Sequence, residues 1–168
     1  MSELYIITGP AGVGKSTIST KLAQNLPKSA LIEGDEIYHQ VIGSYVPAWK
    51  EENHLDIFWK ICADSIKTYL DNNYDVVFNY IVKPENIDYL KNHLDNHEIK
   101  FVVLLVDEET LLQRDSQRPE DCQMKDRCIT LLNNFKSRNY NPNNILDTSK
   151  LSVDETVQTI LETNSFIL

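Results

Sequence analysis

Cysteine is scarce in this sequence of 168 residues, which contains three: Cys62, Cys122 and Cys128. They form no C-x-x-C pair and no cysteine–histidine spacing of the kind that binds zinc. This excludes a C-x-x-C redox motif and a zinc module. Cys62 falls on an apolar helical face, which indicates core packing. The cysteine pattern as a whole favours a reduced protein of the cytoplasm.

Long hydrophobic runs are absent as well. The longest, from Phe101 to Val106, is far too short to cross a bilayer. Nothing at the N-terminus resembles a signal peptide, because the first strand is expected from about residue 4. We find no internal repeat, low-complexity tract or linker. We therefore expect one domain over residues 1–168, with a full hydrophobic core and no membrane partner.

Positive charge is also in short supply. The chain has 16 Lys and Arg residues against 25 Asp and Glu residues, a formal net charge of −9. This balance argues against nucleic acid or an anionic membrane as the main partner. One stretch departs from it. From Arg114 to Arg138 six basic residues stand against four acidic ones, so the rest of the chain is more acidic than the total indicates.

The most informative stretch that is present is Gly9-Pro10-Ala11-Gly12-Val13-Gly14-Lys15-Ser16, which fits the phosphate-binding pattern G-x-x-x-x-G-K-[ST]. A short apolar stretch, Leu4–Thr8, precedes it, and apolar residues at helical spacing follow it as far as Pro27. This strand–turn–helix context favours a true P-loop over a chance match to a glycine-rich turn.

A P-loop binds phosphate because its glycines let successive backbone N–H groups point inward, while the helix N-terminus adds partial positive charge. Lys15 then reaches the β- and γ-phosphates, and the Ser16 hydroxyl ligates Mg²⁺. The sequence therefore predicts ATP and Mg²⁺ as cofactors. The nucleotide-binding residues predicted in this loop are Gly9, Pro10, Ala11, Gly12, Val13, Gly14, Lys15, Ser16 and Thr17.

Four further apolar segments predict strands, and the run at 75–81, without alternation, is typical of a strand buried on both faces of a parallel sheet. The predicted strands cover residues 30–33, 75–81, 100–107 and 144–148. Helices are expected over 36–43, from Leu55 to Asn72, after Pro84, after an N-cap at Asp107, over 129–135 and after the capping box Ser152-x-x-Glu155. Strands alternating with helices predict a three-layer α/β fold, and with the P-loop in this place it resembles the P-loop NTPase and nucleoside-kinase-like class. Its five-stranded, mostly parallel sheet should carry helices on both faces.

Ligands of such folds bind beyond the carboxyl ends of the strands, where the P-loop, Asp35, Asn79 and Asp107 are expected. Asp35 is our candidate to accept a proton from a substrate hydroxyl, and the alternative is an N-cap of the 36–43 helix. No Walker B aspartate stands at the end of the third strand, where Asn79 and Tyr80 lie. If a second acid supports Mg²⁺, Asp35 is the first candidate and Asp107 the second.

Arginines after the fourth strand predict a lid over about residues 113–128. Arg114 and Arg118 lie four apart, so on a continuing helix they share a face. There one can stack on the nucleotide base and the other contact the phosphates; the alternative is an exposed helix end with solvated arginines. Arg127 and His39 are further candidates for substrate contacts. The other three histidines show no metal spacing and are expected on the surface.

On these residues the chain resembles the P-loop small-molecule kinases, which include gluconate and shikimate kinases, chloramphenicol phosphotransferase and zeta-toxin kinases. The resemblance rests on Gly9–Thr17, Gly34-Asp35, the region of Arg114 and Arg118, and the closing strand and helix, so it covers nearly the whole chain. It implies that Asp35 contacts or deprotonates the acceptor hydroxyl. It also implies that the two arginines form a lid over ATP.

Two departures from the gluconate kinase pattern concern the acceptor. The stretch from Glu33 to His39 is similar to the Asp-Gly-Asp-x-x-His signature, but Glu33 replaces its first aspartate. The Arg-x-Gly-His-Phe lid is replaced by Arg118-Pro119-Glu120-Asp121-Cys122. The glycine cluster and the substrate arginine of shikimate kinases are also missing.

The sequence thus predicts a kinase that moves the γ-phosphate of ATP to a hydroxyl of a small molecule, with a gluconate-like sugar acid as the favoured acceptor. Lys15, Asp35 and Arg118 are the predicted catalytic residues. The alternatives are a zeta-toxin- or chloramphenicol phosphotransferase-like kinase, a nucleotide kinase, and a non-catalytic nucleotide-binding regulatory module. The missing N-K-x-D motif weakens a GTPase switch, and the missing Walker B acid weakens a motor ATPase. Oligomeric state stays open.

Overall fold

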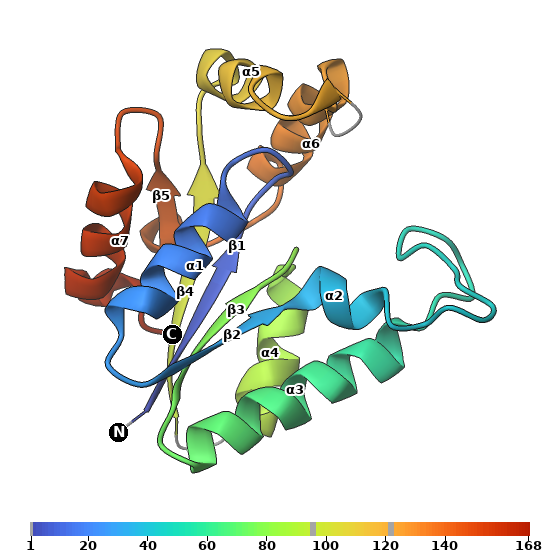
Figure 1. The fold of residues 1–168 in the computed structure, drawn as a ribbon, viewed down its shortest axis with the longest axis vertical. Coiled ribbons are helices and arrows are strands. Elements are labelled where there is room, and N and C mark those ends of the chain that lie inside the picture. Colours follow the sequence, from blue (N-terminus) through green and yellow to red (C-terminus); the bar gives the residue numbers. More distant parts are fainter. Residues whose placement is uncertain (1, 95–96, 121–122) are drawn as a thin grey trace.

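Five parallel strands form the centre of the protein in a computed structural model, which describes residues 2–94, 97–120 and 123–168 (Figure 1). The strands are β1 (Glu3–Thr8), β2 (Ser29–Glu33), β3 (Asp75–Asn79), β4 (Glu98–Leu105) and β5 (Ile145–Asp147). Their order in the sheet is β2-β3-β1-β4-β5, and every neighbouring pair is parallel. The predicted α/β class with a five-stranded, mostly parallel sheet is confirmed.

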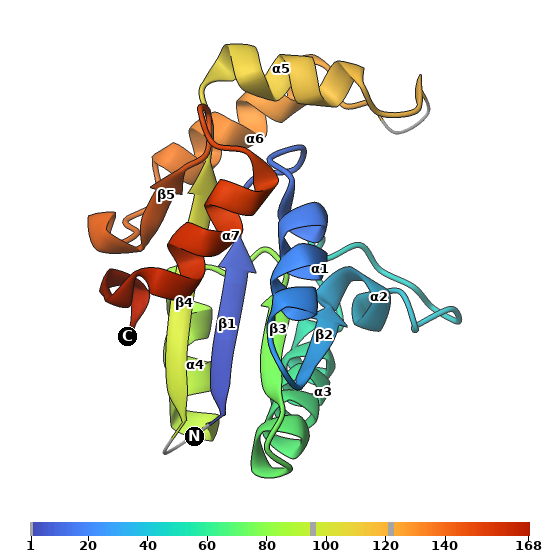
Figure 2. The ribbon, with the colours of Figure 1, turned by 60° about the vertical axis from the view of Figure 1, so that its left-hand side comes forward.

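Helices cover both faces of the sheet and its carboxyl end. They are α1 (Lys15–Asn25), α2 (Gly34–Tyr38), α3 (Leu55–Asp71), α4 (Pro84–His93), α5 (Glu108–Ser116), α6 (Asp126–Lys136) and α7 (Val153–Glu162). Figures 1 and 2 show α1 and α7 on one face, α3 and α4 on the other, and α5 beyond the strand ends together with α6. Among the described residues no helix is long and apolar enough to cross a membrane.

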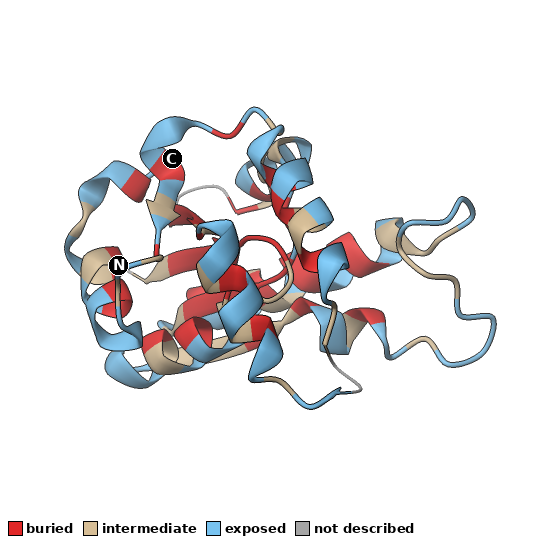
Figure 3. Cartoon of the chain, turned by 90° about the horizontal axis from the view of Figure 1, so that it is seen from above, coloured by how far each residue is buried: buried red, intermediate tan, exposed pale blue. Residues whose placement is uncertain are grey.

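Each face of the sheet has its own hydrophobic cluster. Leu4 and Ile6 of β1 pack with residues of α3 and α4, whereas Tyr5 and Ile7 pack with residues of α1 and α7. In Figure 3 the buried residues gather in the strands and on the inner sides of the helices. The predicted burial of the third strand on both faces is confirmed, because consecutive residues such as Val76 and Val77 are both fully buried.

The largest error of the sequence-based prediction concerns the segment after β2. A helix over 36–43 was expected, but α2 ends at Tyr38 and residues 39–54 contain no helix or strand. Ile42, one of the apolar residues that favoured the longer helix, is 89% exposed, so it has no surface to pack against. The segment instead projects from the molecule between α2 and α3 (Figure 1).

Smaller predictions of local structure are confirmed. Asp107 Oδ1 accepts the backbone N–H of Thr110 at 2.7 Å, which caps α5. The Ser152 hydroxyl accepts the N–H of Glu155 at 3.2 Å, and a Glu155 oxygen accepts the N–H of Ser152 at 2.8 Å, forming the predicted capping box of α7. Cys62 is fully buried in the core, as predicted, while Cys122 lies outside the described residues.

Candidate active site

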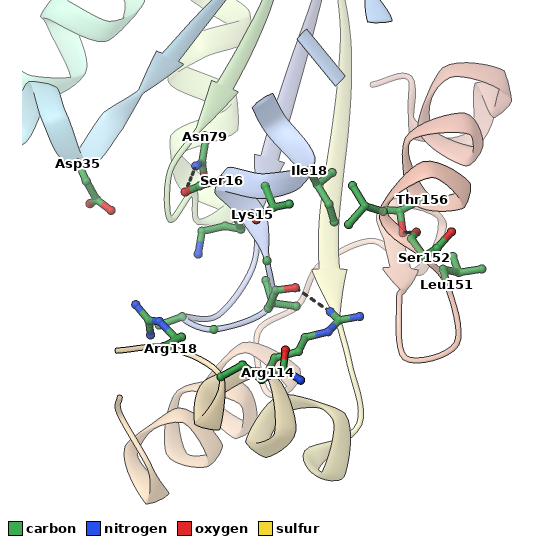
Figure 4. Close-up of a pocket in the computed structure, with 17 residues that line it drawn as sticks. Lys15, Ser16, Ile18, Asp35, Asn79, Arg114, Arg118, Leu151, Ser152 and Thr156 are labelled. Carbon is green, nitrogen blue, oxygen red and sulfur yellow. Dashed lines mark hydrogen bonds between the residues drawn. The ribbon is translucent and has the colours of Figure 1, made fainter. Parts of the chain in front are cut away.

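The P-loop connects β1 to α1 and forms the floor of a cavity of about 640 Å³ (Figure 4). Gly14 has a φ of 101°, a left-handed conformation that lets the chain turn sharply into α1 at Lys15. The side chains of Ser16 and Thr17 are exposed in the first turn of the helix. The predicted site residues that line this cavity are Ala11, Gly12, Val13, Gly14, Lys15, Ser16, Thr17, Asp35, Arg114 and Arg118.

Lys15 extends over the P-loop, where its Nζ donates a hydrogen bond to the carbonyl oxygen of Pro10 at 3.1 Å. Burial lowers the pKa of this lysine from 10.5 to about 8, partly offset by the negative charges of Asp35 and Glu33. Lys15 is half-buried, and in the described part of the chain the hydrogen-bond partner of its ammonium group is a neutral carbonyl, so its charge is undercompensated. An anion such as a phosphate group would supply the missing charge.

Asp35 lies in the first turn of α2 and is exposed. The alternative role of this residue as an N-cap is wrong, because Glu33 occupies the N-cap position and no side chain caps the helix. Within the described ranges no hydrogen bond engages the Asp35 carboxylate, which lines the P-loop cavity. A proton acceptor therefore stands free at the edge of a phosphate-binding cavity.

The structure reveals a cluster beside Ser16 that the sequence analysis missed. Asn79 Nδ2 donates to Ser16 Oγ at 3.1 Å and to Glu33 Oε2 at 2.5 Å. The side-chain oxygen of Asn79 is buried and has no hydrogen-bond partner among the described residues. Burial raises the pKa of Glu33, while the hydrogen bond from Asn79 lowers it.

This cluster fits Mg²⁺, which prefers oxygen ligands and binds proteins through few of them, completing its shell with phosphate and water. Ser16 offers a hydroxyl, Asn79 an unpartnered amide oxygen and Glu33 a carboxylate. No group of three or more His, Cys, Asp or Glu side chains that could hold a metal is found in the described part of the chain. Asp107, the second candidate acid, instead caps α5. The sequence marked Glu33 as the residue in place of the first acid of the Asp-Gly-Asp-x-x-His signature, but only the strand register places it opposite Asn79.

Arg114 joins α5 to the P-loop. Its Nη1 donates to the carbonyl oxygen of Val13 at 2.9 Å and to Thr148 Oγ1 at 3.2 Å, and its Nη2 donates to the carbonyl oxygen of Thr148 at 3.0 Å. Burial lowers the pKa of this arginine. The guanidinium thus holds α5, the P-loop and the end of β5 together at one wall of the cavity.

Arg118 does not share a helical face with Arg114 as predicted, because α5 ends at Ser116. Both arginines nevertheless line the cavity. In Figure 4 Arg118 lies on the same side of the cavity as Lys15 and Asp35, while Arg114 lies toward α7. The side chain of Arg118 is 39% exposed, and among the described residues its ion pair is with Asp115 at 3.5 Å, so it is held loosely there.

Asp115 organises the predicted lid, a role that the sequence analysis did not assign. This carboxylate is 2% exposed, and it accepts the backbone N–H of Lys125 at 2.8 Å and that of Met124 at 3.0 and 3.1 Å. These bonds lower its pKa. They tie the end of α5 to the start of α6 across the arginine-bearing loop. Asp121 and Cys122 of the predicted lid lie outside the described residues.

Two predicted substrate contacts do not line the cavity. Arg127 is exposed in the first turn of α6. His39 is exposed after α2, and its ring stacks on that of Tyr45 with centroids 5.7 Å apart. The other three histidines were expected on the surface but are half-buried. His54 stacks on Tyr38 with ring centroids 4.1 Å apart, and the side chain of His97 is only 14% exposed.

Comparison with known proteins supports this description. The family model described as "AAA domain" matches residues 6–148. None of the curated proteins is significantly similar to the chain in sequence. Among solved structures, the tunicamycin resistance protein of Deinococcus radiodurans is similar with a TM-score of 0.71 and 18% identity, over 95% of this chain and 94% of that one.

Two further structures have comparable scores. A gluconokinase from Sinorhizobium meliloti has a TM-score of 0.70 and 16% identity, over 95% of this chain and 89% of that one. The APS kinase CysC of Mycobacterium tuberculosis, in complex with AMPPNP and APS, has a TM-score of 0.70 and 19% identity, over 96% and 98%. The predicted resemblance to P-loop small-molecule kinases is thereby confirmed for the fold.

Proposed function

The chain belongs to the AAA domain family, and we propose that it is an ATP-dependent phosphotransferase, which moves the γ-phosphate of ATP to a hydroxyl of a small molecule. One observation carries the proposal. Lys15, Asp35 and Arg118 come from three separate segments and line one cavity above the P-loop. A binding module needs only the first of these residues, whereas phosphoryl transfer also needs a proton acceptor and a mobile positive charge.

In this proposal the P-loop N–H groups and Lys15 hold the phosphates of ATP. Asp35 takes the proton of the acceptor hydroxyl. The oxygen of that hydroxyl forms a bond to the γ-phosphorus, while the bond from the γ-phosphorus to the ADP oxygen breaks. Arg118 compensates the negative charge that spreads over the transferred group. Mg²⁺, when bound, would neutralise phosphate charge, and Ser16, Asn79 and Glu33 are the residues that would hold it.

The acceptor is the finer part of the proposal. The sequence favoured a gluconate-like sugar acid, and one structure of similar fold is a gluconokinase. Another is an APS kinase bound to APS, so the fold alone does not choose between acceptors. The regulatory-module alternative lacks an observation in its favour, since it gives no role to the free carboxylate of Asp35. The cytoplasmic location remains a prediction.

Replacement of Asp35 by asparagine tests the proposal. D35N keeps the size of the side chain but removes the proton acceptor, so acceptor-dependent ADP release should fall about 100-fold or more. The affinity for an ATP analogue, measured by calorimetry, should change by less than about threefold. D88N, which removes an exposed acid on α4, is the matched control and should behave like the parent protein. Unchanged turnover of D35N would contradict the proposed function.

A further inference from the structure

We propose that the phosphoryl acceptor carries no negative charge: it is a neutral or cationic hydroxylated molecule, bound beside Asp35 against Tyr80 and the ring of Tyr45. This inference rests on the proposed function, because it describes the acceptor of that reaction. It departs from the sugar acid that the sequence favoured. Three features of the molecule carry it: the distribution of charge, the hydroxyl of Tyr80 and the exposed aromatic rings after α2.

Charge divides sharply between the two sides of the cavity. All four arginines of the chain, Arg114, Arg118, Arg127 and Arg138, lie within 114–138. Residues 29–59, which run from β2 through α2 and the projecting segment into α3, contain six acids and one lysine, and of these acids Asp35 lines the cavity. The acids are Glu33, Asp35, Glu36, Glu51, Glu52 and Asp56, and the lysine is Lys50. An acceptor with a carboxylate or phosphate would meet net repulsion there.

Nearby lysines do not change this balance. Lys60 of α3 forms an ion pair with Asp64 at 3.1 Å, and Lys83 before α4 lies 3.8 Å from Glu85. Lys15 and Arg118 face the P-loop cavity, where the phosphates of ATP would compensate their charges. A gluconate-type acceptor would therefore lack the paired cation that a buried or half-buried carboxylate requires.

Tyr80 supplies the second feature. It follows β3 directly, is 8% exposed, and its hydroxyl makes no hydrogen bond within the part of the chain that the structure describes. Burial is the main cause that raises the pKa of this hydroxyl, and the negative charge of Asp35 raises it further. The Tyr80 ring lies against Gly34, the residue before Asp35. A hydroxyl that has no partner in the described part of the chain and is not sealed from solvent can serve the donor and acceptor needs of an alcohol.

Gly34 explains how Tyr80 reaches this position. A Cβ atom on Gly34 would lie 2.6 Å from Cδ2 of the Tyr80 ring, a contact that real side chains do not make. On its other side the ring packs against Phe58 with centroids 4.5 Å apart. The glycine before Asp35 thus gives space to the tyrosine ring. The Gly34-Asp35 pair and Tyr80 form one packed unit at the ends of β2 and β3.

The third feature is a set of rings that leads from this unit to solvent. Tyr38 donates its hydroxyl hydrogen to the carbonyl oxygen of Val46 at 2.7 Å, which fixes the start of the projecting segment. Tyr45 packs edge-on against Tyr38 with centroids 6.0 Å apart and remains 39% exposed. An aromatic face attracts C–H groups and cations and repels anions, because its π-system is negative. Rings and acids therefore favour the same acceptor charge.

A series of matched polyols tests the inference. Gluconate, glucitol and 1-amino-1-deoxyglucitol share a polyhydroxylated chain, with a terminal group that is negative, neutral or positive. They would be assayed for acceptor-dependent ADP release, within a wider panel of sugar acids, sugars, amino sugars, nucleosides and nucleotides. We expect kcat/KM to be at least about tenfold higher for the best uncharged or cationic acceptor than for its matched acid.

The outcomes separate the two proposals. If an anionic acceptor equals or exceeds its neutral and cationic counterparts, the inference about charge is overturned while the phosphotransferase stands. If no compound of any charge releases ADP although an ATP analogue binds, the proposed function fails and the inference falls with it. Turnover concentrated in the non-anionic acceptors supports both.

Two variants test the named residues with the best acceptor. Y80F removes only the unpartnered hydroxyl, so the protein should keep its melting temperature. We expect the KM for the acceptor to rise about fivefold or more while the KM for ATP stays the same.

E36K reverses an exposed charge beside Asp35 and should shift the anion-to-cation ratio of kcat/KM about tenfold toward anions. D88K, the same reversal on α4, should leave the ratio unchanged. An unaltered acceptor KM in Y80F, or equal ratios in E36K and D88K, would overturn the assignment.

Discussion

The two sides of the cavity are built on different principles. The nucleotide side consists of a contiguous loop, Gly9–Thr17, held against α5 by Arg114. The proposed acceptor side consists of residues from β2, α2, the end of β3 and the segment 39–54, which meet only in the fold. The first side of the cavity is lined by the P-loop, Arg114 and Arg118, and the second by Asp35 and Asn79, while the rings of Tyr38 and Tyr45 pack together outside that lining. This contrast indicates that the phosphate-binding loop is a local property of the chain, whereas the surroundings of Asp35 depend on packing.

The largest effect is expected from K15A, which removes the charge of the nucleotide side. Loss of the ammonium group should reduce turnover by about 100- to 1,000-fold and weaken binding of an ATP analogue in calorimetry. K21A is the matched control, because Lys21 of α1 is exposed and pairs with Asp154 instead of facing the cavity. Full activity in K15A would mean that the cavity is not a triphosphate site.

The substitution D115N tests whether the predicted lid depends on the buried carboxylate of Asp115. In D115N the side chain can no longer offer charged acceptors to the N–H groups of Met124 and Lys125, so the free energy of unfolding should fall by about 1.5–3 kcal/mol. Denaturant titration measures this change. D126N, an exposed acid at the start of α6, should alter the free energy of unfolding by less than about 0.5 kcal/mol. Equal stabilities would show that the α5–α6 connection is held in another way.

The pH dependence of nucleotide affinity tests the burial of Lys15. Its pKa is lowered to about 8, so below pH 7 the amine of the free protein is charged and ready for phosphate. Above pH 8 binding must first take up a proton, and affinity should fall by up to about tenfold per pH unit. Calorimetry of an ATP analogue from pH 6.5 to 9.5 measures the affinity. Repeating it in two buffers with different ionisation enthalpies measures the proton uptake on binding. K15R, whose guanidinium stays charged, should lose this dependence. A flat wild-type profile would contradict the lowered pKa.

The smallest effect is expected from R127A. The sequence predicted a substrate contact for Arg127, but the structure leaves its side chain exposed and outside the cavity. Its removal should change the KM values for ATP and acceptor by less than about twofold in steady-state kinetics. R118A is the comparison, since Arg118 lines the cavity and its loss should reduce kcat by about 100-fold. A large rise in the acceptor KM of R127A would restore the predicted contact.

Several features of the fold could be predicted because their signals are local. The buried strands are continuous apolar runs, the caps at Asp107 and Ser152 lie beside the helices they start, and the P-loop is one uninterrupted motif. The helix expected over 36–43 was predicted from apolar spacing alone and proved too long, because Ile42 has no surface to cover. Helical spacing likewise joined Arg118 to Arg114, although α5 ends between them.

The amino-acid sequence by itself determined that the chain holds a phosphate-binding loop at the end of a parallel sheet. That determination was possible because a P-loop carries its geometry within nine consecutive residues. Only the tertiary structure decided which groups surround it. Parallel pairing sets Glu33 beside Asn79, and packing sets Tyr80 against Gly34, 46 residues away in both cases. Such neighbours are fixed by strand register and by contact between distant segments, and these leave no pattern within a window of sequence.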